Sequence, residues 1–184
     1  MSFVASCEKG LACLAVCCLT ASVGVLAQNP ASAPAQGLST MDLKFVRNAV
    51  ADGMAEVELG KLAQQKGSSG QIKDFGARIE QDHIRLNNEL RAIAAAKGAP
   101  LPTGLSKDRL TMLEQMGKLE GAAFDNAFSQ HMLVGHQSAV SSFDKQALAA
   151  GDADLRALAA RNLPTLRDHL TAARGLGNNA TLGK

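Results

Sequence analysis

The spacing of apolar residues in the stretch 72–93 predicts a long helix with one apolar stripe. The apolar residues recur every seven positions, at Ile72, Ile79, Leu86 and Ile93. This spacing places them on one side of a helix. A companion row at the same spacing contains Gly76, His83 and Leu90. His83 is therefore expected to point toward whatever this helix packs against.

Helix start and stop signals extend this pattern to four long helices and one short helix. Serine, threonine or aspartate caps and glycine stops predict helices over about 40–66, 69–97, 107–117, 121–150 and 152–175. The break near residue 67 is only a few residues long, so the first two helices must form an antiparallel hairpin. No stretch alternates like a strand. The sequence therefore predicts an all-α antiparallel four-helix bundle over residues 40–176, with one extra short helix in its longest connection.

Two features of the last helix modify this prediction. Pro164 cannot donate a backbone hydrogen bond to the carbonyl of Ala160, so a kink or a break is expected there. The residues after Leu176 lack an apolar pattern, and 177–184 are expected to form a disordered tail.

The N-terminal residues are typical of a secretory signal. Lys9 precedes an apolar run over 11–26, and small or apolar residues precede Gln28, so we expect residues 1–27 to be a cleaved signal peptide. An uncleaved membrane anchor is the alternative. Residues 28–39, rich in proline, alanine and glutamine, are expected to be a flexible tether. The protein would then be exported.

Composition narrows the chemistry of the mature chain. All four cysteines lie within residues 1–27, so a disulfide or a thiolate metal site is not expected after cleavage. The net charge is +2, basic residues are dispersed, and tyrosine and tryptophan are absent. Nucleic acid is therefore not an expected partner. No second long apolar run follows the signal, so no transmembrane segment is expected in the mature chain.

Three histidines and one glutamate occupy core-facing positions on four different helices. They are Glu56, His83, His136 and His169. Imidazole and carboxylate are normal ligands of zinc, copper and iron, so the sequence predicts one divalent transition metal in the bundle core. The alternative is a buried polar cluster that needs no metal.

Other polar residues are not expected in this site. His131 lies on a polar flank, about 140° around its helix from His136, and Asp82 and Asp168 are expected to face water. Glu80 and His83 match one Glu-x-x-His motif of di-iron proteins, but the remaining glutamates of that motif are absent. No catalytic residue is identified, so a non-catalytic role is favoured over an enzyme.

Several short motifs occur together along the chain. They include Glu56-Val57-Glu58-Leu59-Gly60, Phe75-Gly76, Asp82-His83, Phe124-Asp125 and Leu163-Pro164 leading to His169. Together they resemble a bacterial family of exported ferritin-like bundles, domain of unknown function 4142. The family tends to have an aspartate where this chain has Gly135 and an apolar residue where it has Glu80. The resemblance implies a ferritin-like four-helix fold and a periplasmic or outer-membrane-associated location, with no established reaction.

These observations lead to two functional hypotheses. The first is an exported metal-binding bundle that acts in metal homeostasis or envelope stress. The second is a structural or interaction module, a homo-oligomer or a binder of an envelope partner, whose histidines only pack and form hydrogen bonds.

Overall fold

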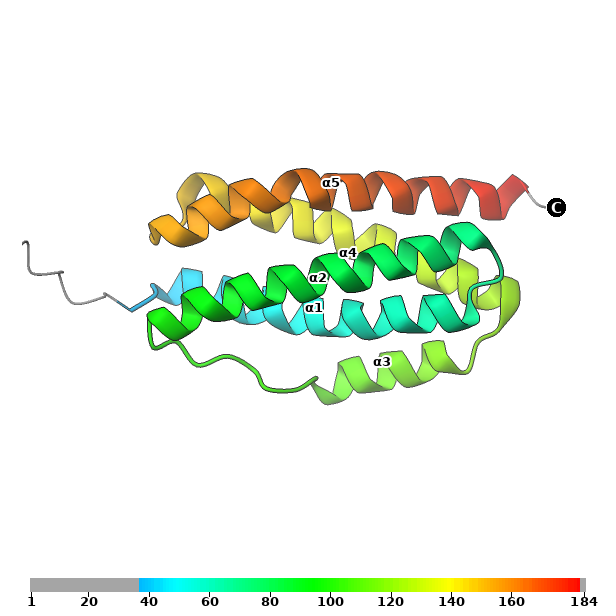
Figure 1. Ribbon diagram of the computed structural model, residues 1–184, viewed down its shortest axis with the longest axis horizontal. Coiled ribbons are helices and arrows are strands. Elements are labelled where there is room, and N and C mark those ends of the chain that lie inside the picture. The colour runs from blue at the N-terminus through cyan, green and yellow to red at the C-terminus, as the bar shows by residue number, and fades with distance from the viewer. Residues whose placement is uncertain (1–36, 183–184) are drawn as a thin grey trace, which may run out of the picture. The chain divides into compact units, whose positions relative to one another are not determined.

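The computed structural model describes residues 37–182, and within them it contains five α-helices and no strand (Figure 1). The helices are α1 (Thr40–Lys66), α2 (Gly70–Ala96), α3 (Lys107–Gly117), α4 (Gly121–Ala149) and α5 (Ala153–Leu182). The predicted all-α bundle with a short third helix is confirmed. The predicted signal peptide and most of the predicted tether lie outside the described residues.

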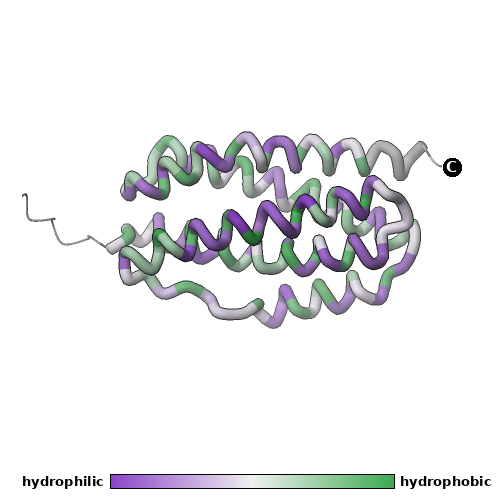
Figure 2. The backbone as a smooth tube through the Cα atoms, viewed as in Figure 1, coloured by the Kyte–Doolittle hydropathy of each residue, from purple (hydrophilic) through white to green (hydrophobic). Residues whose placement is uncertain are grey.

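The four long helices are arranged as two antiparallel hairpins. Helix α1 packs mainly against α2, and α4 packs mainly against α5, while contacts of α2 with α5 and of α1 with α4 join the hairpins. The short helix α3 lies alongside α1, at the end of the longest connection (Figure 1). Hydrophobic and hydrophilic residues alternate along each helix, as expected when one side of each faces a core (Figure 2). No helix in the described range is long and apolar enough to cross a bilayer.

The predicted capping residues hold the helix starts in place. Ser39, Ser69 and Ser106 each accept a hydrogen bond from the backbone N–H three positions further on. Asp152 does the same for α5 by accepting from the N–H of Leu155. Each cap satisfies a donor that the helix itself leaves free, so these residues fix the boundaries between loop and helix.

Glycines allow α1 and α2 to approach closely. A Cβ atom at Gly60 would lie 2.5 Å from the backbone oxygen of Gly76, and one at Gly76 would lie 2.6 Å from the Cβ of Ala63. Any larger residue would push the two helices apart, because real Cβ atoms do not tolerate such distances. This close packing fixes the position of Glu56 on α1 relative to His83 on α2.

Helix α5 differs from the sequence prediction. Of the kink or break expected at Pro164, the break is wrong, because the helix continues through this residue. The neighbouring Leu163 and Leu166 are both buried in the core, which holds the segment helical although Pro164 lacks an N–H. The helical backbone also extends past the expected end near Gly175 to Leu182.

Asp42 connects the start of α1 to the turn between α4 and α5. Its side chain is buried, with 2% of its surface exposed. The carboxylate accepts hydrogen bonds from the side chain of Gln146 at 2.6 Å and from the backbone N–H groups of Gly151 and Asp152 at 3.3 and 3.2 Å. These bonds satisfy two backbone donors outside the helices and link the two hairpins at one end of the bundle.

Replacement of Asp42 by alanine is expected to lower the free energy of unfolding by about 2–3 kcal/mol, because three hydrogen bonds to its buried carboxylate are lost together. Urea denaturation measures this change. The matched control is Asp74→Ala on exposed α2 surface, expected within about 0.5 kcal/mol of the parent protein. Equal effects of the two substitutions would contradict the structural role of Asp42.

Candidate metal centre

One polar layer crosses the interior of the bundle between two apolar clusters. One cluster is built around Val50, Leu86, Phe143 and Leu166. The other is built around Leu59, Ile79, Met132 and Ala173. Along each long helix, the predicted site residue falls between a member of one cluster and a member of the other. Glu56, His83, His136 and His169 are all buried, with 7%, 3%, 0% and 1% of their surfaces exposed.

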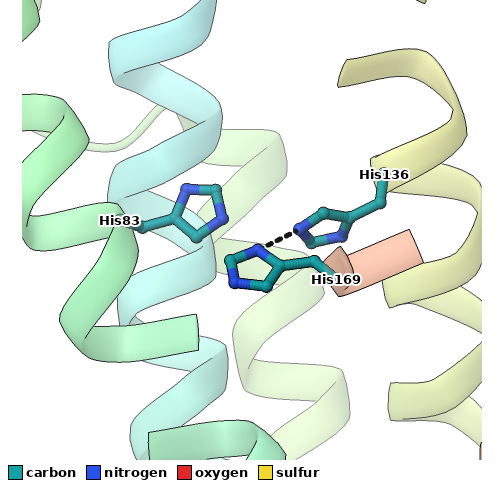
Figure 3. A group of neighbouring side chains, drawn as sticks. All are labelled: His83, His136 and His169. Carbon is teal, nitrogen blue, oxygen red and sulfur yellow. Dashed lines mark hydrogen bonds between the residues drawn. The ribbon is translucent and has the colours of Figure 1, made fainter. Parts of the chain in front are cut away.

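The three histidines converge from three helices. His83 on α2, His136 on α4 and His169 on α5 turn their rings toward one another (Figure 3). Ring centroids are separated by 5.1 Å between His136 and His169 and by 5.6 Å from each of these to His83. One nitrogen from each ring can be chosen so that all three lie within 4.8 Å of one another. Such spacing allows the three rings to bind a single ion.

Two of the histidines have their outer nitrogens bound to oxygen acceptors. Nδ1 of His136 lies 3.0 Å from the backbone oxygen of Met132. Nε2 of His169 lies 2.8 Å from the carboxylate oxygen Oδ2 of Asp82. A carbonyl and a carboxylate can only accept, so each ring carries its proton on the outer nitrogen. The inner nitrogens, Nε2 of His136 and Nδ1 of His169, then present lone pairs.

These two lone pairs face each other. Nε2 of His136 and Nδ1 of His169 are 3.2 Å apart, and this contact, dashed in Figure 3, is a hydrogen bond only if one of the two nitrogens carries a proton. Without a proton, the two nitrogens repel. A neutral imidazole has only one N–H, which both rings already use for their outer acceptors. A positive charge between the inner nitrogens, either a proton or a metal ion, removes this repulsion.

His83 has the least satisfied ring of the three. Neither of its buried nitrogens makes a hydrogen bond in the described part of the chain. Nδ1 lies 3.1 Å from Oε2 of Glu56, which is within hydrogen-bond distance but is not aligned for a hydrogen bond. Leaving a buried polar group unpaired costs about 1–3 kcal/mol. The described residues therefore provide no hydrogen bond that would offset the cost of burying the His83 ring.

Burial keeps the three rings neutral near pH 7. Loss of hydration lowers the pKa of His83, His136 and His169 from 6.5 to about 4 in each case, although neighbouring carboxylates oppose the shift. The pKa of Glu56 is raised because its carboxylate is buried, an effect that His136 partly opposes. At neutral pH, no ring proton is then available between His136 and His169, and the lone pairs remain free for a metal ion.

Replacement of His83 by leucine is expected to stabilise the metal-free protein by about 1–3 kcal/mol, since it removes two buried nitrogens without hydrogen bonds and keeps a similar volume. The melting temperature of the metal-free variant, measured by circular dichroism, should therefore rise by about 2–12 °C. A lower melting temperature would show that His83 stabilises the metal-free fold, which would contradict its role as an unpaired group that needs a ligand.

Asp82 corrects the sequence interpretation, which expected it to face water. It accepts hydrogen bonds from His169 and from Arg85, at 2.8 and 2.7 Å. Burial alone would raise the pKa of Asp82, but these hydrogen bonds outweigh it and lower the pKa. The sequence did contain a signal for this position, because Asp82 follows Phe75 by seven residues and so lies on the same side of α2. Phe75 is buried, and its ring centroid lies 6.1 Å from that of His169.

The remaining polar residues lie where the sequence places them. Asp168 is exposed, with 69% of its side-chain surface accessible. His131 is half-buried and is not part of the three-histidine group. Glu80 accepts a hydrogen bond from Gln64 at 2.6 Å and lies outside that group as well. The site is therefore a three-histidine cluster with carboxylates around it, and it does not have the ligand set of a di-iron centre.

Comparison with known proteins supports the fold. The family model described as "Domain of unknown function (DUF4142)" matches residues 27–176. A crystal structure of a DUF305 fragment from Deinococcus radiodurans superposes with a TM-score of 0.66 at 16% sequence identity, covering 77% of this chain and 99% of the fragment. At this identity the likeness concerns the fold alone. A search of curated proteins finds no match.

Proposed function

This chain belongs to the DUF4142 family, and from that premise we propose that it is an exported protein that binds one divalent transition metal ion in its bundle core. The ligands are Nε2 of His83, Nε2 of His136 and Nδ1 of His169, the nitrogens that do not face the surrounding oxygens. The observation that carries the proposal is the 3.2 Å contact between Nε2 of His136 and Nδ1 of His169, two rings whose other nitrogens both face oxygen acceptors, beside a third ring without a hydrogen bond to the described residues.

The distance between the facing nitrogens is suitable for a metal ion. Two imidazole nitrogens bound to one tetrahedral zinc ion at about 2.05 Å are about 3.3 Å apart. The separation of 3.2 Å between His136 and His169 is close to this value. An ion between them would convert a repulsive contact into two metal bonds.

Three oxygen acceptors lie beside the nitrogens that would not bind the metal ion, one for each histidine. Metal-bound histidines usually donate their other N–H to a carboxylate or a carbonyl, which fixes the ring and its tautomer. Asp82 accepts such a hydrogen bond from His169, and the carbonyl of Met132 accepts one from His136. Glu56 can accept one from His83 after a small rotation of its side chain, since its Oε2 is already 3.1 Å from Nδ1 of His83. The sequence suggested Glu56 as a metal ligand. In this proposal it instead orients the ligand His83 by accepting a hydrogen bond from its Nδ1.

The donor set favours zinc, copper or iron over magnesium or calcium. Neutral imidazole suits zinc, copper and iron, whereas magnesium and calcium prefer oxygen ligands. The predicted signal peptide supports a periplasmic or outer-membrane-associated location, where such a protein would act in metal homeostasis or in the response to envelope stress. An interaction module whose histidines only form hydrogen bonds is less well supported, because His83 forms none.

The test uses the mature protein, purified without a histidine tag and stripped of metal. Zinc, copper(II) and iron(II) are titrated separately, with binding followed by calorimetry and stability by thermal melts. We expect one equivalent of at least one metal to bind, and to add about 2.7 kcal/mol of stability when the free metal is 100 times the dissociation constant. Failure of all three metals to bind or to stabilise the protein would overturn the proposal.

A further inference from the structure

A cavity connects the surface of the bundle with the histidine cluster. It has a volume of about 410 Å³ and lies between α1 and α4, with residues of α3 on its outer wall. His83 and Glu56 form part of its lining, so it reaches the candidate metal centre. At the outer wall, Arg109 of α3 is paired with Asp52 of α1. A cavity of this size is large enough for a small organic molecule.

The carboxylate of Glu56 is a second feature of this cavity. It is buried and forms no hydrogen bond with the described residues, but its Oε2 lies 3.1 Å from Nδ1 of His83 and its Oε1 lies 3.8 Å from Nδ1 of His136. Its Oε1 faces α4 at Gly135, where a Cβ atom would lie 3.4 Å away, and Gly135 also lines the cavity. Oε1 therefore borders an accessible space and has no donor among the described residues within hydrogen-bond distance, whereas Oε2 is next to His83.

The three histidines leave the coordination of a bound ion incomplete. Zinc and its neighbours in the periodic table take four or more ligands. In the described part of the chain, the ligand group holds three histidines and no further histidine, cysteine, aspartate or glutamate. A fourth ligand must then come from outside the protein, and the cavity provides a route to it.

Resting on the proposed metal site, we infer that the cavity binds a small protic ligand of the metal ion. Such a ligand has a lone pair for the metal and an N–H or O–H group for the Glu56 carboxylate. Water, small alcohols and azoles have this chemistry. Glu56 acts as a positioning residue that selects ligands carrying a proton, because a ligand without one would leave this buried acceptor unpaired.

Cobalt(II)-loaded protein provides the test, since the visible spectrum of cobalt changes with its coordination. The probes are imidazole and 1-methylimidazole, which both offer a lone pair, although only imidazole retains an N–H. We expect imidazole to change the spectrum and to bind about tenfold more tightly than 1-methylimidazole, which corresponds to about 1.4 kcal/mol. Cobalt content is measured after each titration.

Two variants test the route. Gly135→Leu places a side chain in the cavity beside Glu56, and Ser138→Trp obstructs the exposed part of its lining. Each should weaken imidazole binding about tenfold or more through steric overlap and leave cobalt affinity within about threefold. The matched control, Gly175→Leu on α5, has open space around it and should bind imidazole as the parent does.

The outcomes separate this inference from the proposed function. If cobalt binds but imidazole leaves its spectrum unchanged, the coordination is closed, and the inference is wrong while the metal site stands. Equal affinity for the two probes would overturn the role of Glu56, and full imidazole affinity in both cavity variants would overturn the route. If cobalt does not bind at all, the proposed function and the inference both fail.

Discussion

Replacement of His136 by alanine is expected to weaken zinc binding by roughly 10²- to 10³-fold. Structural zinc sites with four ligands contribute about 10–16 kcal/mol, so one ligand accounts for about 3–4 kcal/mol. His136 is fully buried, and its inner nitrogen lies 3.2 Å from that of His169. Competition with a chromogenic zinc chelator measures the dissociation constant.

The control for this substitution is His131→Ala on the same helix. His131 is half-buried and lies outside the three-histidine group, so zinc affinity should stay within about threefold of the parent. Far-UV circular dichroism of both variants verifies that α4 remains folded. An unchanged zinc affinity of the His136→Ala variant would remove His136 from the site, and an equal loss of affinity in both variants would point to a general effect of losing a histidine.

The metal-free protein is expected to lose most of its stability between pH 6.5 and about 4. The unfolded chain binds protons on His83, His136 and His169 near pH 6.5, whereas in the folded protein burial lowers each pKa to about 4. The unfolded state therefore binds more protons in this window, and stability falls as the pH falls. A pKa lowered from 6.5 to about 4 corresponds to a loss of about 3 kcal/mol for one ring by pH 4. The three losses are not additive, because the rings also lower one another's pKa, but a loss of several kcal/mol is a large part of the stability of a typical domain.

Two carboxylates modify this pH dependence. Burial raises the pKa of Glu56, so the folded protein takes up that proton more readily and the loss is partly offset as the pH falls. The lowered pKa of Asp82 adds a loss only at more acidic pH. Urea denaturation at pH 7, 6 and 5.5 measures the slope, and His83→Leu should reduce it by about one proton. A stability independent of pH in this range would contradict the buried, neutral state of the rings.

The fold and most of the site follow from local patterns. Heptad spacing placed Glu56, His83, His136 and His169 toward the core, and the angular position of His131 kept it out. The serine caps at Ser39, Ser69 and Ser106 also follow from local rules. These predictions succeed because periodicity and capping involve residues within one helix.

Properties that depend on two helices could not be obtained in this way. The sequence does not specify how far α2, α4 and α5 slide along one another, so it could not show that the three histidines share one level. The bond between Asp82 and His169 depends on the same register. The helical path through Pro164 depends on burial of Leu163 and Leu166, which local propensity does not include.

The distribution of the three histidines over the two hairpins has a consequence for the order of assembly. His136 and His169 both belong to the α4–α5 hairpin, whereas His83 belongs to the α1–α2 hairpin. The second hairpin alone offers an ion two nitrogens, and the third arrives only when the hairpins dock. If the proposed site binds a metal ion, tight binding would be a late event in folding, and the ion would come from the compartment in which the chain finishes folding. Separation of the hairpins would release it.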